Sequence, residues 1–170
     1  MNPDPFREGL AAARRGDFST AADLWRGLAQ KGDARAQYNL GYLYANGRGV
    51  AQDYPAALEW YIQAAEQGFA PAQFNLGVLY SNDDGVPTDF AVALKWYRAA
   101  AGQGDADAQF NLGIAYALGQ GVTQDYVQAY RWYDLAATAG HDKAAKTRDS
   151  IAAELTPEQL AKCQRPAARN

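Results

Sequence analysis

A six-residue motif recurs at a fixed interval along this chain and constrains its fold more than any other feature. Ala-Gln-Tyr-Asn-Leu-Gly at residues 36–41 returns as Ala-Gln-Phe-Asn-Leu-Gly at residues 72–77 and again at 108–113, so successive copies lie 36 residues apart. A fixed period of this length is typical of helical-repeat solenoids, in which each unit buries its apolar face only against its neighbours. We therefore predict an all-α repeat fold with an extended binding surface in place of a closed reaction pocket.

Further positions recur with the same period in three consecutive copies. Each copy continues with a tyrosine, a Gly-Val pair, an aspartate, a Trp-Tyr pair, two alanines and a closing glycine. In the first copy these are Tyr44, Gly49-Val50, Asp53, Trp60-Tyr61, Ala64-Ala65 and Gly68. The second copy departs from the pattern at Asp83, where the other copies have Gly47 and Gly119, so its loop is expected to take a different turn.

The apolar positions of each unit follow the period of two α-helices. In the first copy, Leu40, Leu43 and Tyr44 share one face of a first helix, and Ala57 and Tyr61 share one face of a second. The recurring aspartates are placed to accept hydrogen bonds from unpaired N–H groups at the start of each second helix: Asp53, Asp89 and Asp125. The closing glycines suit the left-handed residue just beyond the end of that helix: Gly68, Gly104 and Gly140.

This pattern resembles the Sel1-like repeat family, a relative of the tetratricopeptide repeat. The motifs that carry the resemblance are, in order, A-x-x-x-L-G-x-x-Y, G-V-x-x-D, A-x-x-W-Y and A-A-x-x-G. The resemblance covers about residues 34–144. It implies a right-handed α-α solenoid of Sel1-like, tetratricopeptide-like helix pairs, with about ten helices and no strands. Because the family is found in bacterial signalling, envelope and secretion proteins and in eukaryotic quality control, it implies protein binding without selecting a partner.

The repeats predict one domain over residues 1–170. A degenerate, tetratricopeptide-like unit is expected at 4–32, full repeats at 33–68, 69–104 and 105–140, and capping helices at 141–170. Asp4 and Pro5 supply an N-cap and a first-turn proline for a helix of about residues 5–15. The segment from Thr156 to Gln159 is a capping box that starts a final helix over about 157–164. Atypical terminal units are expected because they cover the open ends of the stack.

Composition and charge narrow the classes of partner. The net charge of −3 argues against nucleic acid, whose binders usually carry a basic face. No apolar run approaches the ~18–20 residues that span a bilayer, so we expect no membrane insertion. The N-terminus has no recognisable signal peptide, which predicts a cytoplasmic location for the chain as it stands, or a periplasmic or secreted one if a leader has been removed. We expect a monomer.

The sequence offers little material for catalysis or metal binding. His141 and Cys163 are the single histidine and the single cysteine, too few for a metal-ligand pattern, so we predict no metal, no cofactor and no enzymatic activity. His141 occupies the position of Asp33 and Asp105 at a helix start, which favours a cap or loop histidine. Cys163 cannot close an internal disulfide and is interpreted as a packing or surface thiol.

The resemblance implies that the first helix of each pair lines a concave groove that holds the partner. The groove positions of the family are assigned to this chain by their place within the repeat. In the first two repeats they are Arg35, Tyr38, Asn39, Tyr42, Asn46, Phe74, Asn75, Val78, Ser81 and Asn82. In the third repeat and the capping helix they are Asp107, Phe110, Asn111, Ile114, Leu118, Lys143, Lys146 and Thr147.

Two rows within this set have two interpretations each. The asparagine row (Asn39, Asn75, Asn111) either pairs with the backbone of an extended peptide or satisfies groups of neighbouring helices. The aromatic row (Tyr38, Phe74, Phe110) is either inter-repeat core or ligand surface, whereas the tryptophans of the second helices are assigned to packing.

The sequence thus predicts a non-enzymatic scaffold or adaptor that binds a peptide or protein. A structural or oligomerisation module is the first alternative, and an exposed apolar patch at a terminal helix would favour it. A small-ligand protein or enzyme is the second, and it would need a closed pocket with a perturbed titratable group.

Overall fold

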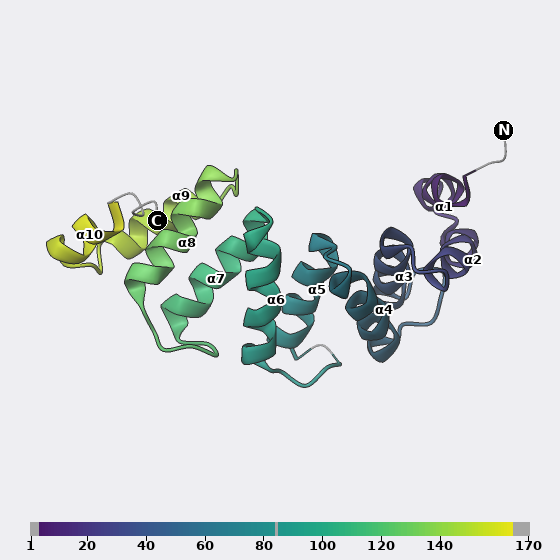
Figure 1. Cartoon of the computed structure of the whole chain (residues 1–170), viewed down its shortest axis with the longest axis horizontal. Coiled ribbons are helices and arrows are strands. Elements are labelled where there is room, and N and C mark those ends of the chain that lie inside the picture. Colours follow the sequence, from purple (N-terminus) through teal and green to yellow (C-terminus); the bar gives the residue numbers. More distant parts are fainter. Residues whose placement is uncertain (1–3, 84, 165–170) are drawn as a thin grey trace. The chain divides into compact units, whose positions relative to one another are not determined.

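The computed structural model describes residues 4–83 and 85–164, which contain ten α-helices and no strand (Figure 1). The chain divides into two compact units, residues 1–88 and 89–170. The helices of the first unit are α1 (Pro5–Arg14), α2 (Phe18–Ala29), α3 (Ala34–Asn46), α4 (Tyr54–Glu66) and α5 (Ala70–Ser81). Those of the second are α6 (Phe90–Gly102), α7 (Ala106–Leu118), α8 (Tyr126–Thr138), α9 (Ala144–Ala152) and α10 (Pro157–Gln164). These elements confirm the all-α prediction.

Aspartate caps define most of the helix starts. Side-chain oxygens of Asp53, Asp89 and Asp125 accept hydrogen bonds from backbone N–H groups in the first turns of α4, α6 and α8, which confirms their predicted role. Asp4 caps α1 in the same way, with Pro5 as the first helical residue. The predicted capping box is also present, since Thr156 N donates to Gln159 Oε1 at 2.9 Å and Gln159 N donates to Thr156 Oγ1 at 3.2 Å.

The loops after α3 and α7 have the same construction. Each helix ends at a glycine in the left-handed region, Gly47 with φ 61° and Gly119 with φ 69°. A glutamine then braces the end of the helix, because Gln52 Nε2 donates to Ala45 O and Gln124 Nε2 donates to Ala117 O. After α5, by contrast, the chain leaves the helix through Asn82 in an extended conformation, which confirms the different turn predicted from Asp83. Asp84 lies outside the described residues.

Close contact between paired helices depends on small residues. A Cβ atom on Gly41 of α3 would lie 2.9 Å from the ring of Tyr61 on α4, and one on Gly113 of α7 would overlap the ring of Tyr133 on α8. Real structures essentially never contain such short contacts, so the glycine of the six-residue motif allows the tyrosine ring of the second helix to pack directly against the first helix.

Each unit has its own apolar core. In the first unit, α1, α2 and α3 enclose a cluster that includes Ala12, Trp25, Leu40 and Leu43, with Trp60 of α4 packed against it. In the second unit, Ala117, Ala129 and Tyr133 of α7 and α8 form a cluster that Ile151 of α9 helps to cover. The packing role predicted for Trp60 is confirmed, and α9 contributes to a cap over α8.

A row of buried glutamines is the feature of the fold that sequence reasoning missed. Gln37, Gln73 and Gln109 are only 3%, 6% and 7% exposed. Each donates from Nε2 to a backbone carbonyl eight residues earlier, at 3.1, 3.1 and 3.3 Å: the carbonyls of Ala29, Ala65 and Ala101. Those carbonyls belong to the last turns of α2, α4 and α6, whose C-terminal C=O groups lack intrahelical partners. The glutamine row therefore joins each second helix to the first helix of the next pair.

Candidate functional site

The predicted binding residues lie on one face of the first-of-pair helices. On α3, Ala36, Leu40 and Leu43 are at most 1% exposed, whereas Tyr38 and Asn39 are half-buried and Tyr42 is 38% exposed. On α5, Phe74, Asn75 and Val78 are likewise half-buried beside the buried Ala72 and Leu76. We call the outward side chains of α3 and α5, together with Arg35, Asn46, Ser81 and Asn82, the α3–α5 face.

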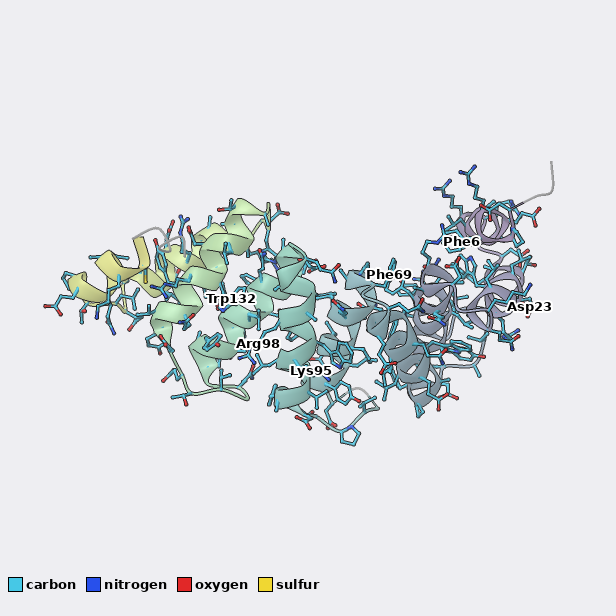
Figure 2. The ribbon with its side chains drawn as sticks, viewed as in Figure 1. Phe6, Asp23, Phe69, Lys95, Arg98 and Trp132 are labelled. Carbon is cyan, nitrogen blue, oxygen red and sulfur yellow. The ribbon has the colours of Figure 1, made fainter. Side chains whose placement is uncertain are left out.

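Tyr38 belongs to an aromatic cluster within the first unit. Its ring centroid lies 5.8 Å from that of Tyr61 on α4 and 5.4 Å from that of Phe69, which directly precedes α5. Figure 2 labels Phe69, which stands where other repeats have a capping aspartate and makes no side-chain cap bond. Tyr38 thus packs between helices, as the core interpretation of the aromatic row requires, and it keeps part of its surface accessible.

Asn75 makes a structural hydrogen bond. Its Nδ2 donates to the hydroxyl of Tyr61 at 3.1 Å, and Tyr61 is only 2% exposed. Burial raises the pKa of the Tyr61 phenol well above its usual range, and the hydrogen bond from Asn75 opposes that rise. Asn75 therefore satisfies a buried hydroxyl, as the structural interpretation of the asparagine row requires. Asn39 on α3 is half-buried, and in the described structure its amide makes no hydrogen bond.

The charge of Arg35 is already paired. Its guanidinium contacts the Asp33 carboxylate at 2.7 Å and lies 4.3 Å above the ring of Phe6, which Figure 2 labels on α1. The hydrogen bond from Arg35 also lowers the pKa of Asp33. Arg35 thus joins α1 to the start of α3, and its charge is largely satisfied within the protein.

The remaining side chains of the α3–α5 face are more open. Asn46 is exposed at the end of α3, where its Nδ2 donates to Tyr42 O at 2.8 Å. Asn82 is exposed just beyond α5, and Ser81 Oγ donates to Val78 O at 3.0 Å. Tyr42 is the exposed aromatic side chain of this face.

In the second unit, Phe110 lies between two rings. Its centroid lies 5.3 Å from that of Tyr133 and 4.0 Å from that of His141, which is stacked on it at an interplanar angle of 16°. His141 Nδ1 accepts a hydrogen bond from Lys143 N at 3.3 Å, and its Nε2 lies 3.5 Å from an oxygen of Asp107. His141 is thus a loop histidine before α9, whereas the N-cap residue of that helix is Lys143, which makes no side-chain cap bond.

The other candidates of the second unit flank this stack and form, with it, the α7–α9 face. Asn111 and Ile114 are half-buried on α7, and Ile114 packs against the cluster around Tyr133. Leu118 at the end of α7 is 63% exposed. Lys143 and Lys146 are exposed, and α9 begins at Ala144, so Lys143 lies just before the helix. Thr147 bonds within α9, donating from Oγ1 to Lys143 O.

Sequence reasoning also missed Arg48, beside the α3–α5 face. It lies between the two glycines of the loop after α3, and its guanidinium carbon is 5.7 Å from the ring centroid of Tyr42. The sequence does distinguish Arg48, because it is the positively charged residue at a repeat position where the other two copies have Asp84 and Gln120.

The part of the chain that the structure describes has neither a metal cluster nor a membrane-spanning helix. Residues 4–83 and 85–164 contain no cluster of three or more His, Cys, Asp or Glu side chains suited to a metal ion. Within the same residues, no helix has the length and apolarity needed to cross a bilayer.

The fold and this repeated face define a helical-repeat protein with two helices per unit. The Sel1 repeat family model matches residues 34–69, 70–105 and 106–141, and the chain belongs to this family. Sel1 repeats typically mediate protein–protein interactions.

Solved structures agree with this assignment. The chain is 35% identical to a Sel1 repeat protein from Oxalobacter formigenes, with a TM-score of 0.81 over 88% of this chain and 60% of that one. It is 39% identical to a protective antigen of uropathogenic Escherichia coli with the same repeat fold, with a TM-score of 0.83 over 88% of this chain and 33% of the antigen. The chain thus spans less than two thirds of either relative, and both come from bacteria. No match was found among curated proteins.

Proposed function

We propose that this protein is a non-enzymatic adaptor that binds an extended segment of a protein partner on the outward faces of the first-of-pair helices within one unit. The observation that carries the proposal is the division of α3 into a fully buried side and a side where Tyr38, Asn39 and Tyr42 keep accessible surface. Such a face offers aromatic area and amide groups together, a combination suited to a peptide backbone and its side chains.

Two charged or titratable groups of these faces, Arg35 and His141, have structural roles that support binding over catalysis. Arg35 is paired with Asp33, and His141 accepts a backbone hydrogen bond while stacked on Phe110. General acid–base chemistry needs a group free to exchange a proton with a substrate, and these groups are engaged in holding helices together.

The proposal extends to partner class and location. The net charge of −3 favours protein partners over nucleic acid. A cytoplasmic, monomeric adaptor is proposed for the chain as it stands.

One observation favours the alternative of an oligomerisation module. The side chains of Leu118 and Leu135 are 63% and 49% exposed, and exposed apolar side chains can pair with a second copy of the chain. Light scattering at rising protein concentration tests this alternative.

Site-specific photocrosslinking in cells tests the adaptor proposal. A benzophenone amino acid in place of Tyr42 is expected to crosslink a discrete protein partner. The same amino acid in place of Glu59, which is exposed on α4, serves as the matched control on a second-of-pair helix. Crosslinks to the same partner from Glu59 but not from Tyr42 would contradict the proposed face.

A further inference from the structure

Arg48 is held over two aromatic rings at the edge of the α3–α5 face. Its guanidinium carbon lies 5.3 Å from the ring centroid of Phe18, the first residue of α2, and 5.7 Å from that of Tyr42 on α3. Both distances lie within the range of cation–π attraction, which favours a guanidinium placed over a ring. The rings therefore hold Arg48 in place without neutralising its charge.

Arg48 differs in this respect from Arg35, the other arginine of the first unit that lies over a ring. Arg35 has the Asp33 carboxylate at 2.7 Å, whereas Arg48 has no carboxylate within ion-pair distance among the described residues. An exposed guanidinium that is oriented but unpaired keeps its forked N–H donors available for a carboxylate from outside the chain.

The loop itself does not require an arginine at this position. In the third repeat, Gln120 occupies the same place between Gly119 and Gly121, whose φ angles of 69° and 68° match the 61° and 70° of Gly47 and Gly49. The bracing bond is also the same, since Gln124 repeats the contact that Gln52 makes. Because a glutamine supports this turn equally well, the charge of Arg48 is not needed for the fold.

We propose that Arg48 and Tyr42 together recognise an acidic side chain, Asp or Glu, in the extended peptide segment that binds the α3–α5 face. This inference rests on the proposed function and specifies the chemistry of its partner. The guanidinium supplies two parallel donors to the carboxylate, and the exposed Tyr42 ring contacts the apolar part of the next side chain.

The charges around this position favour a single acidic residue over a polyanion. From Gly49 to Thr88 the first unit has no lysine or arginine, but it carries acidic residues that include Asp53, Glu59 and Glu66. A segment with many negative charges, or a nucleic acid, would find no further basic side chain in this stretch, which includes all of α4 and α5. The expected partner segment therefore has one carboxylate facing Arg48 and neutral or basic residues beyond it.

Selection from a phage-displayed library of random dodecapeptides tests this proposal. The baits are the wild-type chain and its variants R48Q and R14Q. Arg14 is an exposed arginine on α1, so its replacement removes the same charge at another place. Enrichment of one acidic position is expected with wild type and R14Q and is expected to be absent with R48Q. R48Q should melt within about 2 °C of wild type, because it installs the residue of the equivalent loop.

A double-mutant cycle with the strongest selected peptide then measures the coupling. R48Q is expected to weaken binding at least about tenfold, and replacing the peptide's acidic residue by its amide should weaken binding to wild type equally while leaving R48Q unchanged. Peptides selected without any acidic preference, or an acidic preference that R48Q retains, would overturn the role of Arg48 and leave the adaptor proposal standing. A marked loss of thermal stability in R48Q would also overturn it, because Arg48 would then be structural. Failure to enrich any peptide, together with no crosslink from Tyr42, would contradict both proposals.

Discussion

The side-chain oxygen of Gln37 accepts a hydrogen bond from Nε2 of Gln67, 2.7 Å away. With the bond that Gln37 donates to Ala29 O, this contact satisfies a buried amide on both its donor and its acceptor side. In the third repeat, Ala139 stands where Gln67 stands in the first, and Oε1 of Gln109 is buried without a hydrogen-bond partner among the described residues. The last repeat therefore has an incomplete version of the same connection.

Ala139→Gln is expected to complete this connection and stabilise the protein. Ala139 has φ −78° and ψ −1°, almost the values of Gln67 at −81° and 2°, so the new side chain can follow the same path. One hydrogen bond to a buried acceptor typically contributes about 0.5–1.5 kcal/mol. Urea unfolding of A139Q and of A139M, which has similar length but no amide, provides the measurement. An equal gain in both variants would show that the effect comes from the longer side chain and not from the hydrogen bond.

The glutamine row shows which part of the fold sequence reasoning could not reach. The period, the aspartate caps and the terminal capping box follow from local spacing, so they were predicted directly. The contacts of Gln37 were not, because its main partner is the backbone carbonyl of Ala29 in another helix, and a carbonyl leaves no signature in the sequence. The sequence did contain a hint of this role, because a glutamine recurs at the same position of each repeat among the apolar residues that face the core.

The candidate site was predictable to a similar extent. The position of a residue within the repeat was enough to place the candidates on the first helix of each pair and at partly exposed positions, such as Tyr42. It left the role of Asn75 open, because that role depends on whether the hydroxyl of Tyr61 reaches the amide across two helices. It also passed over Arg48, since the repeat pattern has no preferred residue at that loop position.

Asn75→Ala is expected to reduce stability more than Asn39→Ala. The first substitution removes the donor to the buried Tyr61 hydroxyl, at a cost of about 0.5–1.5 kcal/mol, whereas the described structure shows no side-chain hydrogen bond at Asn39. Melting temperatures of the two variants give the comparison. Equal effects would mean that the Tyr61 bond contributes nothing beyond the loss of side-chain volume.

The buried tyrosines predict a loss of stability at alkaline pH. Burial raises the pKa of Tyr133 to about 12 and raises that of Tyr61 as well, while an unfolded tyrosine titrates near pH 10. Below pH 10 both states are protonated and the contribution is constant. Above pH 10 the unfolded chain loses protons that the folded chain keeps, so the free energy of unfolding falls by up to about 1.4 kcal/mol per pH unit for each such tyrosine.

Urea titrations between pH 8 and pH 11.5 measure this slope. Tyr133→Phe keeps the ring that packs on α7 but removes the ionisable hydroxyl, so its stability should fall less steeply with pH. A slope identical to that of wild type would mean that Tyr133 ionises in the folded protein as readily as in the unfolded chain.

Deleting every residue after Gly140 is expected to make the protein aggregate or dimerise. The deletion removes α9, whose Ala144 is fully buried and whose Ile151 packs beside Tyr133. It also removes the ion pair at 2.7 Å between Arg148 and Asp134 of α8. Several hundred Å² of apolar surface at about 25 cal/mol per Å² amounts to several kcal/mol, a large part of a typical domain's stability.

Size-exclusion chromatography with light scattering measures the result. A chain that ends at Glu154 is the matched control, because it loses α10 but keeps α9, and it is expected to remain monomeric. A soluble monomer with unchanged melting temperature after deletion at Gly140 would show that α9 does not act as a cap.

The most direct test of the central claim is hydrogen exchange with mass spectrometry, with and without the strongest peptide from the library selection. Binding on the first-of-pair helices predicts slower exchange in α3 and α5 of the first unit, with little change in α2 and α4. Slowed exchange confined to α2 and α4, or no slowing at saturating peptide, would contradict the account.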